Sequence, residues 1–241
     1  MTMPRVGVLG GLGPAATVDF LDQLVRLTPA RCDQDHLPVL AAFLPQVPDR
    51  SAAILGQGPD PLPGLLEGIA LLNQSDVDVI AIPCNSAHHW HAQLSARSKA
   101  PILHIARACA QRLQLPPGTP ILVLGTRGVQ HSDLYPQALR AVGLQGVQAD
   151  ALGLQDEVDR CIAQVKAGQR QVAADGLMQV LAQARTQGLT WVILGCTELP
   201  VAARACEHLG PGVIDSTRAL AEAVIAHVGT AQASHEVEGP P

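Results

Sequence analysis

An internal repeat is the feature of this 241-residue chain that most constrains its fold. The run Val6-Gly7-Val8-Leu9-Gly10, followed by a glycine-rich loop, resembles Ile121-Leu122-Val123-Leu124-Gly125 and the loop after it. At the same offset, Phe20 matches Tyr135 and Thr17 matches Ser132. A chain that repeats a buried strand and the helix after it is expected to build two similar lobes, related by a pseudo-twofold axis.

Short β-branched runs alternate with amphipathic stretches along the whole chain, a pattern typical of an α/β fold with parallel sheets. Buried strands are expected at residues 4–9, 38–44, 78–82, 120–124 and 190–194. Apolar residues three and four apart predict helices. The clearest stripes are Val18/Leu21/Val25, Leu62/Leu65/Leu66/Ile69/Leu72 and Leu177/Val180/Leu181/Ala184.

The repeat also predicts how the chain divides. One α/β lobe is expected to comprise residues 1–103 plus a final helix at 215–230, and the other residues 104–214. Residues 231–241 are expected to form a flexible, solvated tail. The active site should then lie in the cleft between the two lobes.

Composition excludes several classes of function. A net charge of −5 leaves no basic surface for nucleic acid. The hydrophobic fraction of 47% and the charged fraction of 15% indicate a folded chain. No apolar run approaches the roughly 20 residues of a membrane span, and no leader peptide is evident. We therefore expect a soluble, cytoplasmic protein that binds neither membranes nor nucleic acid.

A cysteine follows a predicted strand in each half of the chain. The first copy is Ile82-Pro83-Cys84-Asn85-Ser86 and the second is Leu194-Gly195-Cys196-Thr197-Glu198. Parallel sheets bind ligands at the carboxyl ends of their strands. Backbone N–H groups at the start of a following helix can hold a carboxylate and lower the pKa of a thiol. Cys84 and Cys196 are therefore candidate functional thiols.

The other cysteines lack this context. Cys161 falls in an apolar helical stripe, and Cys109 and Cys206 also occupy ordinary core positions, where cysteine acts as a small hydrophobe. Cys32 lies in a polar loop. Because the chain has no CxxC pair and looks cytosolic, a disulfide framework is not expected.

A mirrored pair of thiols suits the inversion of a stereocentre. One cysteine, as thiolate, takes a proton from one face of a carbon atom, and the other, as thiol, returns a proton to the opposite face. The planar carbanion between them needs hydrogen-bond donors, which Asn85, Ser86, Thr197 and nearby backbone amides can supply.

These residues also carry a resemblance to a known family. The chain resembles aspartate racemases, the cofactor-independent branch of the aspartate/glutamate racemase superfamily, over nearly its whole length. The matching stretches are Gly10-Gly11-Leu12-Gly13-Pro14 with Thr17, Asp33-Gln34-Asp35-His36, Pro45-Gln46-Val47-Pro48-Asp49-Arg50, Ile54-Leu55-Gly56, Pro83-Cys84-Asn85-Ser86-Ala87-His88, Lys166-Ala167-Gly168 and Gly195-Cys196-Thr197-Glu198.

The resemblance implies two-base racemisation by Cys84 and Cys196 without pyridoxal phosphate or metal, and a homodimer. It further implies that Arg50 and Lys166 bind the carboxylates of a dicarboxylic amino acid. A planar guanidinium can grip a carboxylate bidentately, and an ammonium supplies a point charge. The remaining expected substrate-binding residues are Gly11, Asn85, Ser86, Thr126, Thr197 and Glu198.

Departures from the family pattern leave the substrate open. Phe43-Leu44 stands where relatives usually carry Asn, Val129 replaces a usual Thr, and Ser86 also replaces a Thr. The first two changes are expected to remove polar groups near the substrate. Glu198 favours the aspartate branch, but glutamate, another amino acid, or a related isomerase or decarboxylase reaction stays open.

Three rival hypotheses rest on other patterns. The run Gly11 to Ala16 approximates a dinucleotide-binding loop, but the second strand ends without the acidic residue that binds ribose. Cys84, His88, His89 and His91 suggest a metal cluster, although solvated histidines with Trp90 packed beneath explain this helix better. A non-catalytic carboxylate-binding module would not need both cysteines.

Overall fold

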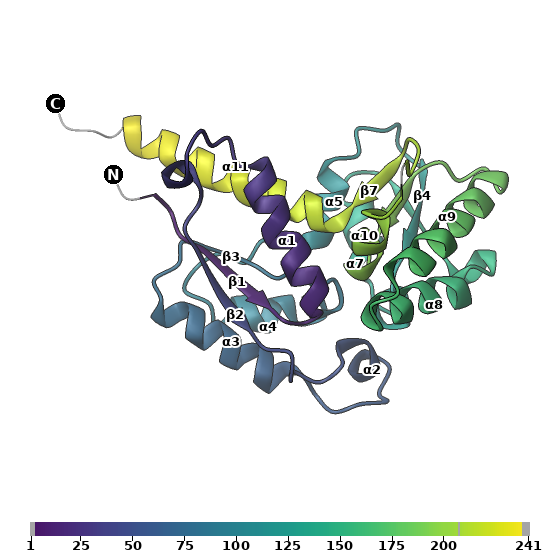
Figure 1. The fold of residues 1–241 in the computed structure, drawn as a ribbon, viewed down its shortest axis with the longest axis horizontal. Helices are drawn as coiled ribbons and strands as arrows, with labels where there is room; N and C mark the ends of the chain where they lie inside the picture. The colour runs from purple at the N-terminus through teal and green to yellow at the C-terminus, as the bar shows by residue number, and fades with distance from the viewer. Residues whose placement is uncertain (1–2, 207, 238–241) are drawn as a thin grey trace.

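Two parallel β-sheets form the framework of the molecule, which we describe from a computed structural model covering residues 3–206 and 208–237. The two sheets lie side by side in Figure 1, each with its own helices. The strands of the first sheet are β1 (Val6–Gly10), β2 (Val39–Phe43) and β3 (Val79–Ala81), and those of the second are β4 (Pro120–Leu124), β5 (Gln145–Gln148), β6 (Val192–Leu194) and β7 (Val213–Asp215).

Both sheets place their strands in the same order. The first runs β2-β1-β3 and the second β5-β4-β6-β7, so the repeated strands β1 and β4 each lie between two neighbours. Val8 pairs with Ala41 and Ala81, and Leu122 pairs with Val147 and Val192, all in parallel. The predicted α/β fold with two similar lobes is confirmed.

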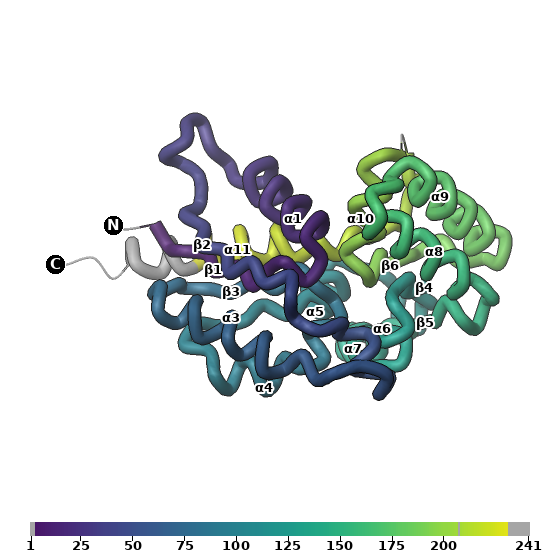
Figure 2. The backbone as a smooth tube through the Cα atoms, turned by 60° about the horizontal axis from the view of Figure 1, so that its bottom comes forward, coloured from purple at the N-terminus to yellow at the C-terminus, as the bar shows by residue number. Residues whose placement is uncertain are grey.

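Helices cover both faces of each sheet. In the first lobe, α1 and α3 lie on opposite sides of the sheet, as both views show (Figures 1 and 2). The helices are α1 (Pro14–Leu27), α2 (Arg50–Ile54), α3 (Leu62–Gln74), α4 (His91–Ser95), α5 (Ile105–Gln111), α6 (Arg127–His131), α7 (Leu134–Arg140), α8 (Gln155–Lys166), α9 (Arg170–Thr186), α10 (Glu198–Ala203) and α11 (Ser216–Val237), with short 3-10 turns at Asp33–Asp35, Ser86–Trp90 and Asp150–Leu152.

Successive strand residues feed separate cores, because side chains of a strand alternate between the two faces of its sheet. Val6 and Val8 of β1 pack with Phe20 of α1. Leu9 packs with Leu65 and Ile69 of α3, in a core that also receives Ile80 and Ile82. Strands buried on both faces explain why they were visible as short continuous apolar runs.

The predicted stripe on α1 is wrong. Val18 and Val25 are 61% and 58% exposed, and the buried face instead carries Ala16, Thr17, Phe20, Gln23 and Leu24. Because Thr17 and Gln23 on this face are polar, the apolar pattern of the sequence does not mark the face as buried. The stripes on α3 and α9 are confirmed. Leu65, Ile69 and Leu72 of α3 are buried, and so are the four stripe residues of α9, Leu177, Val180, Leu181 and Ala184.

The last helix joins the lobes. α11 begins at Ser216, directly after β7 of the second sheet, and its Leu220, Val224 and Val228 enter the core formed by Phe20 and β1 of the first lobe. Figure 1 shows it running from β7 to α1. We therefore propose that the lobes divide near residue 103 and again near 215.

The chain's end differs from the expected tail. The predicted tail covers residues 231–241, but α11 continues as far as Val237. Residues 238–241 lie outside the described residues. Among the residues that are described, none of the helices is both long and apolar enough to cross a membrane.

Candidate active site

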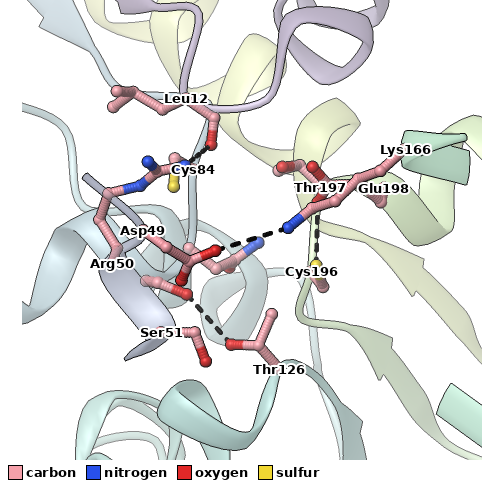
Figure 3. Close-up of a pocket in the computed structure, with 12 residues that line it drawn as sticks. Leu12, Asp49, Arg50, Ser51, Cys84, Thr126, Lys166, Cys196, Thr197 and Glu198 are labelled. Carbon is pink, nitrogen blue, oxygen red and sulfur yellow. Dashed lines mark hydrogen bonds and ion pairs between the residues drawn. The ribbon is translucent and has the colours of Figure 1, made fainter. Parts of the chain in front are cut away.

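A pocket with about 330 Å³ of empty space lies where the cysteine loops of the two lobes meet. Side chains from both lobes enclose it, with Cys84 and Cys196 on separate sides (Figure 3). The lining residues are Leu12, Asp49, Arg50, Ser51, Cys84, Asn85, Ser86, Thr126, Lys166, Cys196, Thr197 and Glu198.

All the predicted site residues except Gly11 line this pocket. Gly11 has a φ of +81°, and a Cβ atom there would lie 2.6 Å from the Leu44 backbone nitrogen. Its N–H donates to Thr17 Oγ1 over 2.8 Å. Glycine is therefore required for the loop after β1, which brings the neighbouring Leu12 to the pocket.

Sequence reasoning missed Leu12, Asp49 and Ser51 as lining residues. Asp49 accepts a hydrogen bond from the Ala52 N–H and so caps α2, with Arg50 as the first residue of that helix. The available sequence signal for Asp49 was its position directly before Arg50, since the helix cap and the first residue of the helix lie close together. Leu12 and Ser51 have no distinguishing sequence feature.

Arg50 is held in place by backbone carbonyls. Its Nη1 donates to Val47 O and Pro48 O, each over 2.9 Å, and its Nη2 donates to Leu12 O. Its buried Nε has no hydrogen-bond partner among the described residues. The guanidinium is therefore preorganised, with Nε–H and the second Nη2–H not used by these three hydrogen bonds.

Cys84 has this guanidinium as its nearest charge partner. Burial alone would lower the pKa of Arg50, but the Cys84 sulfur, Asp49 and Glu198 outweigh it, so the pKa is raised. A thiolate at Cys84 thus has a cation beside it, held by groups that do not titrate.

Cys196 has the opposite environment. The Cys196 thiol donates to Glu198 Oε2 over 3.0 Å. Burial, and next the charge of Glu198, raise the pKa of Cys196 well above its ordinary value. The two cysteines therefore have charged neighbours of opposite sign, a cation beside Cys84 and an anion beside Cys196.

Lys166 and Asp49 face each other across the pocket. Lys166 ends α8 in the second lobe, and its Nζ lies 3.8 Å from Asp49 Oδ2 of the first lobe (Figure 3). Both side chains are about half exposed. Pairs of this kind contribute little to stability, so Lys166 is free to exchange Asp49 for another carboxylate.

Three further hydrogen bonds join the lobes around the pocket. Ser86 Oγ lies 3.1 Å from Thr126 Oγ1, and the Gly128 N–H donates to Ser51 Oγ over 2.9 Å. Thr197 Oγ1 donates to Pro83 O over 3.3 Å. Thr126 also caps α6, because its Oγ1 accepts from the Val129 N–H.

His88 differs from the sequence interpretation, whereas His89 is exposed as expected. His88 is buried rather than solvated, and its Nε2 lies 3.1 Å from Ile82 O. Trp90 is buried as expected. Burial, with the nearby His104 and His91, lowers the pKa of His88 well below its ordinary value. Within the described part of the chain, no group of three or more His, Cys, Asp or Glu residues has the arrangement of a metal site.

The departures from the family pattern mostly lie outside the pocket. Phe43 is 44% exposed, Leu44 packs in the core beside α3, and Val129 is buried; none of them lines the cavity. Only Ser86 does. Phe43, Leu44 and Val129 therefore do not change the residues that line the pocket.

The remaining cysteines are unpaired. Cys109 and Cys161 are fully buried, Cys206 is half-buried and Cys32 is exposed. Burial raises the pKa of Cys109 to about 12 and that of Cys161 to about 11. The interpretation of Cys109 and Cys161 as packing residues is confirmed, whereas Cys206 is only partly covered.

Comparison with known proteins identifies relatives. A family model described as Asp/Glu/Hydantoin racemase matches residues 9–224. The broad specificity amino-acid racemase RacX of Bacillus subtilis (strain 168) is 26% identical over 226 residues, covering 91% of this chain and 96% of that protein. A glutamate racemase of Shewanella loihica is 30% identical over 156 residues, covering 63% and 58%. The solved structure of Picrophilus torridus aspartate racemase is 31% identical, with a TM-score of 0.82 over 94% of each chain.

Proposed function

Because the chain belongs to the Asp/Glu/hydantoin racemase family and is an amino-acid racemase, we propose that it interconverts L- and D-aspartate by proton transfer between Cys84 and Cys196. The observation that carries this proposal is the pairing of the two cysteines. They enter one pocket from different lobes, Cys84 next to the Arg50 guanidinium and Cys196 with its thiol donating to Glu198.

The proposed reaction consists of two proton transfers, and its atoms and electrons balance in each. The Cys84 thiolate takes the α-proton, and the electron pair of the broken C–H bond stays on the α-carbon. The Cys196 S–H then gives its proton to the opposite face, which leaves Cys84 as thiol and Cys196 as thiolate. The other enantiomer reacts in the reverse direction and restores the first state. No cofactor or metal is required by this scheme.

The charges of the pocket support a dicarboxylic substrate. Arg50 and Lys166 are its two cations, and we assign them to the two carboxylates of aspartate. Glu198 and Asp49 are its two anions and can receive the α-ammonium group. We assign Asn85, Ser86, Thr126 and Thr197 to the carbanion and the substrate oxygens, since hydroxyl and amide donors stabilise developing charge.

A second candidate is racemisation of several amino acids. The RacX protein carries the description broad specificity and is similar to this chain over nearly its full length. The half-exposed ion pair of Lys166 with Asp49 also favours it, because a neutral substrate could leave this pair intact. The two candidates differ in whether Lys166 must release Asp49.

The test is racemisation in deuterated water. Purified protein is given each enantiomer of aspartate, glutamate, alanine and lysine, and α-deuteration and chirality are followed by NMR and chiral chromatography. Aspartate is expected to exchange and racemise fastest. Comparable rates for all four would support the broad-specificity candidate, and no exchange with any amino acid would refute the racemase scheme.

We also propose a cytoplasmic homodimer. Free thiols in the pocket need a reducing compartment. The edge strand β2 exposes Val39, Leu40 and Phe43, and α1 exposes Val18 and Val25, which supports a covered surface. Light scattering after gel filtration should give twice the 25.2 kDa chain mass; a monomer at micromolar concentration contradicts this.

A further inference from the structure

Tyr135 is a buried residue whose hydroxyl group the proposed reaction does not use. It is the single tyrosine of the chain, it belongs to α7 of the second lobe, and only 1% of it is exposed. Its counterpart in the internal repeat is Phe20, which packs in a core with no hydroxyl to satisfy. A buried hydroxyl is costly unless it is hydrogen-bonded, so its partner is informative.

That partner is the residue after the first cysteine. The Tyr135 hydroxyl donates to Asn85 Oδ1 over 2.6 Å, and Asn85 Nδ2 donates to Ser216 Oγ over 3.1 Å. Asn85 lines the pocket beside Cys84. The bond therefore runs from the second lobe to the cysteine loop of the first.

The direction of this bond is determined by its surroundings. Burial, and next the neighbouring Cys109, raise the pKa of Tyr135 well above its ordinary value, so the hydroxyl stays protonated. Cys109 lies 3.7 Å from that hydroxyl and, because the Tyr135 proton goes to Asn85, the thiol is the donor to the tyrosine oxygen. In the structure, Tyr135 thus remains protonated and gives its proton to Asn85 Oδ1.

A fixed donor at Oδ1 determines which way the Asn85 carboxamide faces. Rotation of the amide by half a turn would replace Oδ1 by the NH₂ group, so the Tyr135 hydroxyl could no longer donate to Asn85 and both hydroxyl partners, Tyr135 and Ser216, would have to turn their protons. In the observed orientation one amide N–H is used by Ser216, and the described residues show no bond for the second. A free donor is thus held on a pocket-lining residue.

The second cysteine loop has a matching link. Thr197, the residue after Cys196, donates to Pro83 O, which immediately precedes Cys84. Tyr135 also packs against this loop, since a Cβ atom at Gly195 would lie 2.9 Å from its ring. Each cysteine loop is therefore tied to the other lobe, and Tyr135 touches both.

We infer that Tyr135 is a positioning residue that orients the Asn85 carboxamide, so that its free N–H donates to the charge developing on the substrate. The inference rests on the proposed racemase function for its catalytic part only. Loss of the hydroxyl should reduce transition-state stabilisation while leaving substrate binding nearly unchanged, which lowers kcat more than it raises KM.

The orientation can be measured without activity. Asn73 and Asn85 are the only asparagines, so selective ¹⁵N-asparagine labelling gives two carboxamide signals, assigned with Asn85→Ala. In Tyr135→Phe the Asn85 signal should shift and exchange faster with water. The Asn73 signal, from an amide bonded to Arg97 O, should stay unchanged. An unchanged Asn85 signal would overturn the inference, whether or not the protein racemises aspartate.

A double-mutant cycle tests the catalytic part. Tyr135→Phe should lower kcat by about tenfold, a fraction of the roughly 10²–10³-fold cost of deleting a donor. In an Asn85→Ala background the same change should have no further effect, because Tyr135 acts through Asn85. Additive losses in kcat would overturn this role, as would an equal loss in the control Cys109→Ala, which removes the other neighbour of the hydroxyl. A wild-type protein without racemase activity would instead refute the proposed function.

Discussion

The Cys196 thiol donates its proton to Glu198 Oε2 over 3.0 Å, in the same pocket where Cys84 lies beside Arg50. The carboxylate and the guanidinium thus give the two cysteines unlike charged neighbours, as the proposed scheme requires for a proton donor and a proton acceptor.

Glu198→Gln should lower the pKa of Cys196. The amide keeps a hydrogen-bond acceptor but removes the charge that opposes the thiolate, while burial continues to raise the pKa. Alkylation of Cys196 by iodoacetamide, followed by mass spectrometry over a pH series, should therefore have its midpoint at lower pH. Cys206 is the internal control, since burial and Asp175 raise its pKa independently. An unmoved midpoint would show that Glu198 does not govern this thiol.

Removal of either pocket cysteine should abolish racemisation. Cys84→Ala and Cys196→Ala each delete one of two required proton-transfer groups, so a loss of at least about 10³-fold is expected. Chiral chromatography measures it, and circular dichroism checks the fold. Cys32→Ala, at an exposed cysteine outside the pocket, is the matched control and should retain activity. A single pocket variant with wild-type turnover contradicts the two-base scheme.

Lys166→Met should separate dicarboxylic from neutral substrates. The change keeps a long apolar stem but removes the charge assigned to the second carboxylate, so kcat/KM for aspartate should fall about tenfold, by about 1.4 kcal/mol. The value for alanine should change less than about twofold. Lys99→Met, at the only other lysine, is the control. Equal losses for both amino acids would remove Lys166 from substrate selection.

Gly128→Ala should disturb the approach of the two lobes. A Cβ atom there would lie 2.7 Å from Ser51 Cα and 3.0 Å from Ser51 O, which belong to α2 of the other lobe. The backbone must move, so activity should fall at least about tenfold, because small displacements of reacting groups are costly. Gly229→Ala, with open space around its Cβ, should leave turnover unchanged. Full activity in Gly128→Ala would indicate that α2 and α6 adjust freely.

Stability should decrease on mild acidification. Burial, with His91 and Arg107, lowers the pKa of His104 from 6.5 to about 4 in the folded chain. The unfolded chain therefore binds more protons between these values, and the free energy of unfolding should fall as pH drops from 6.5 toward 4. Urea titrations at several pH values measure this. His104→Asn can still cap α5 but cannot titrate, so its stability should depend less on pH. An identical slope would exclude His104.

The repeat made much of this architecture predictable. Continuous apolar runs and two matching cysteine loops indicated the two lobes and the pocket. A strand that is buried on both faces of its sheet is apolar at every position, and this is visible in the sequence. The strands β5 and β7 were missed, since Gln145–Gln148 is largely polar and Val213–Asp215 is short. The role of Tyr135 was also missed, although its match to Phe20 showed that one half carries an extra hydroxyl.

Burial by tertiary contacts accounts for the other differences. Thr17 on α1 and His88 near Cys84 are polar residues that the fold covers; backbone groups bond Thr17 Oγ1 and His88 Nε2, while the buried His88 Nδ1 has no partner among the described residues. Asp49 enters the pocket only because it caps a helix of five residues. Hydrophobic periodicity in the sequence does not reveal hydrogen-bond partners or helix caps of this kind.

The course of α11 has a consequence for biosynthesis. Leu220, Val224 and Val228 complete a core whose other members, Phe20 and the β1 residues, are translated much earlier. The first lobe must therefore wait, with part of its interior uncovered, until these residues of α11 have been translated. Nascent chains stalled before residue 216 should consequently attract chaperones that a finished chain does not need.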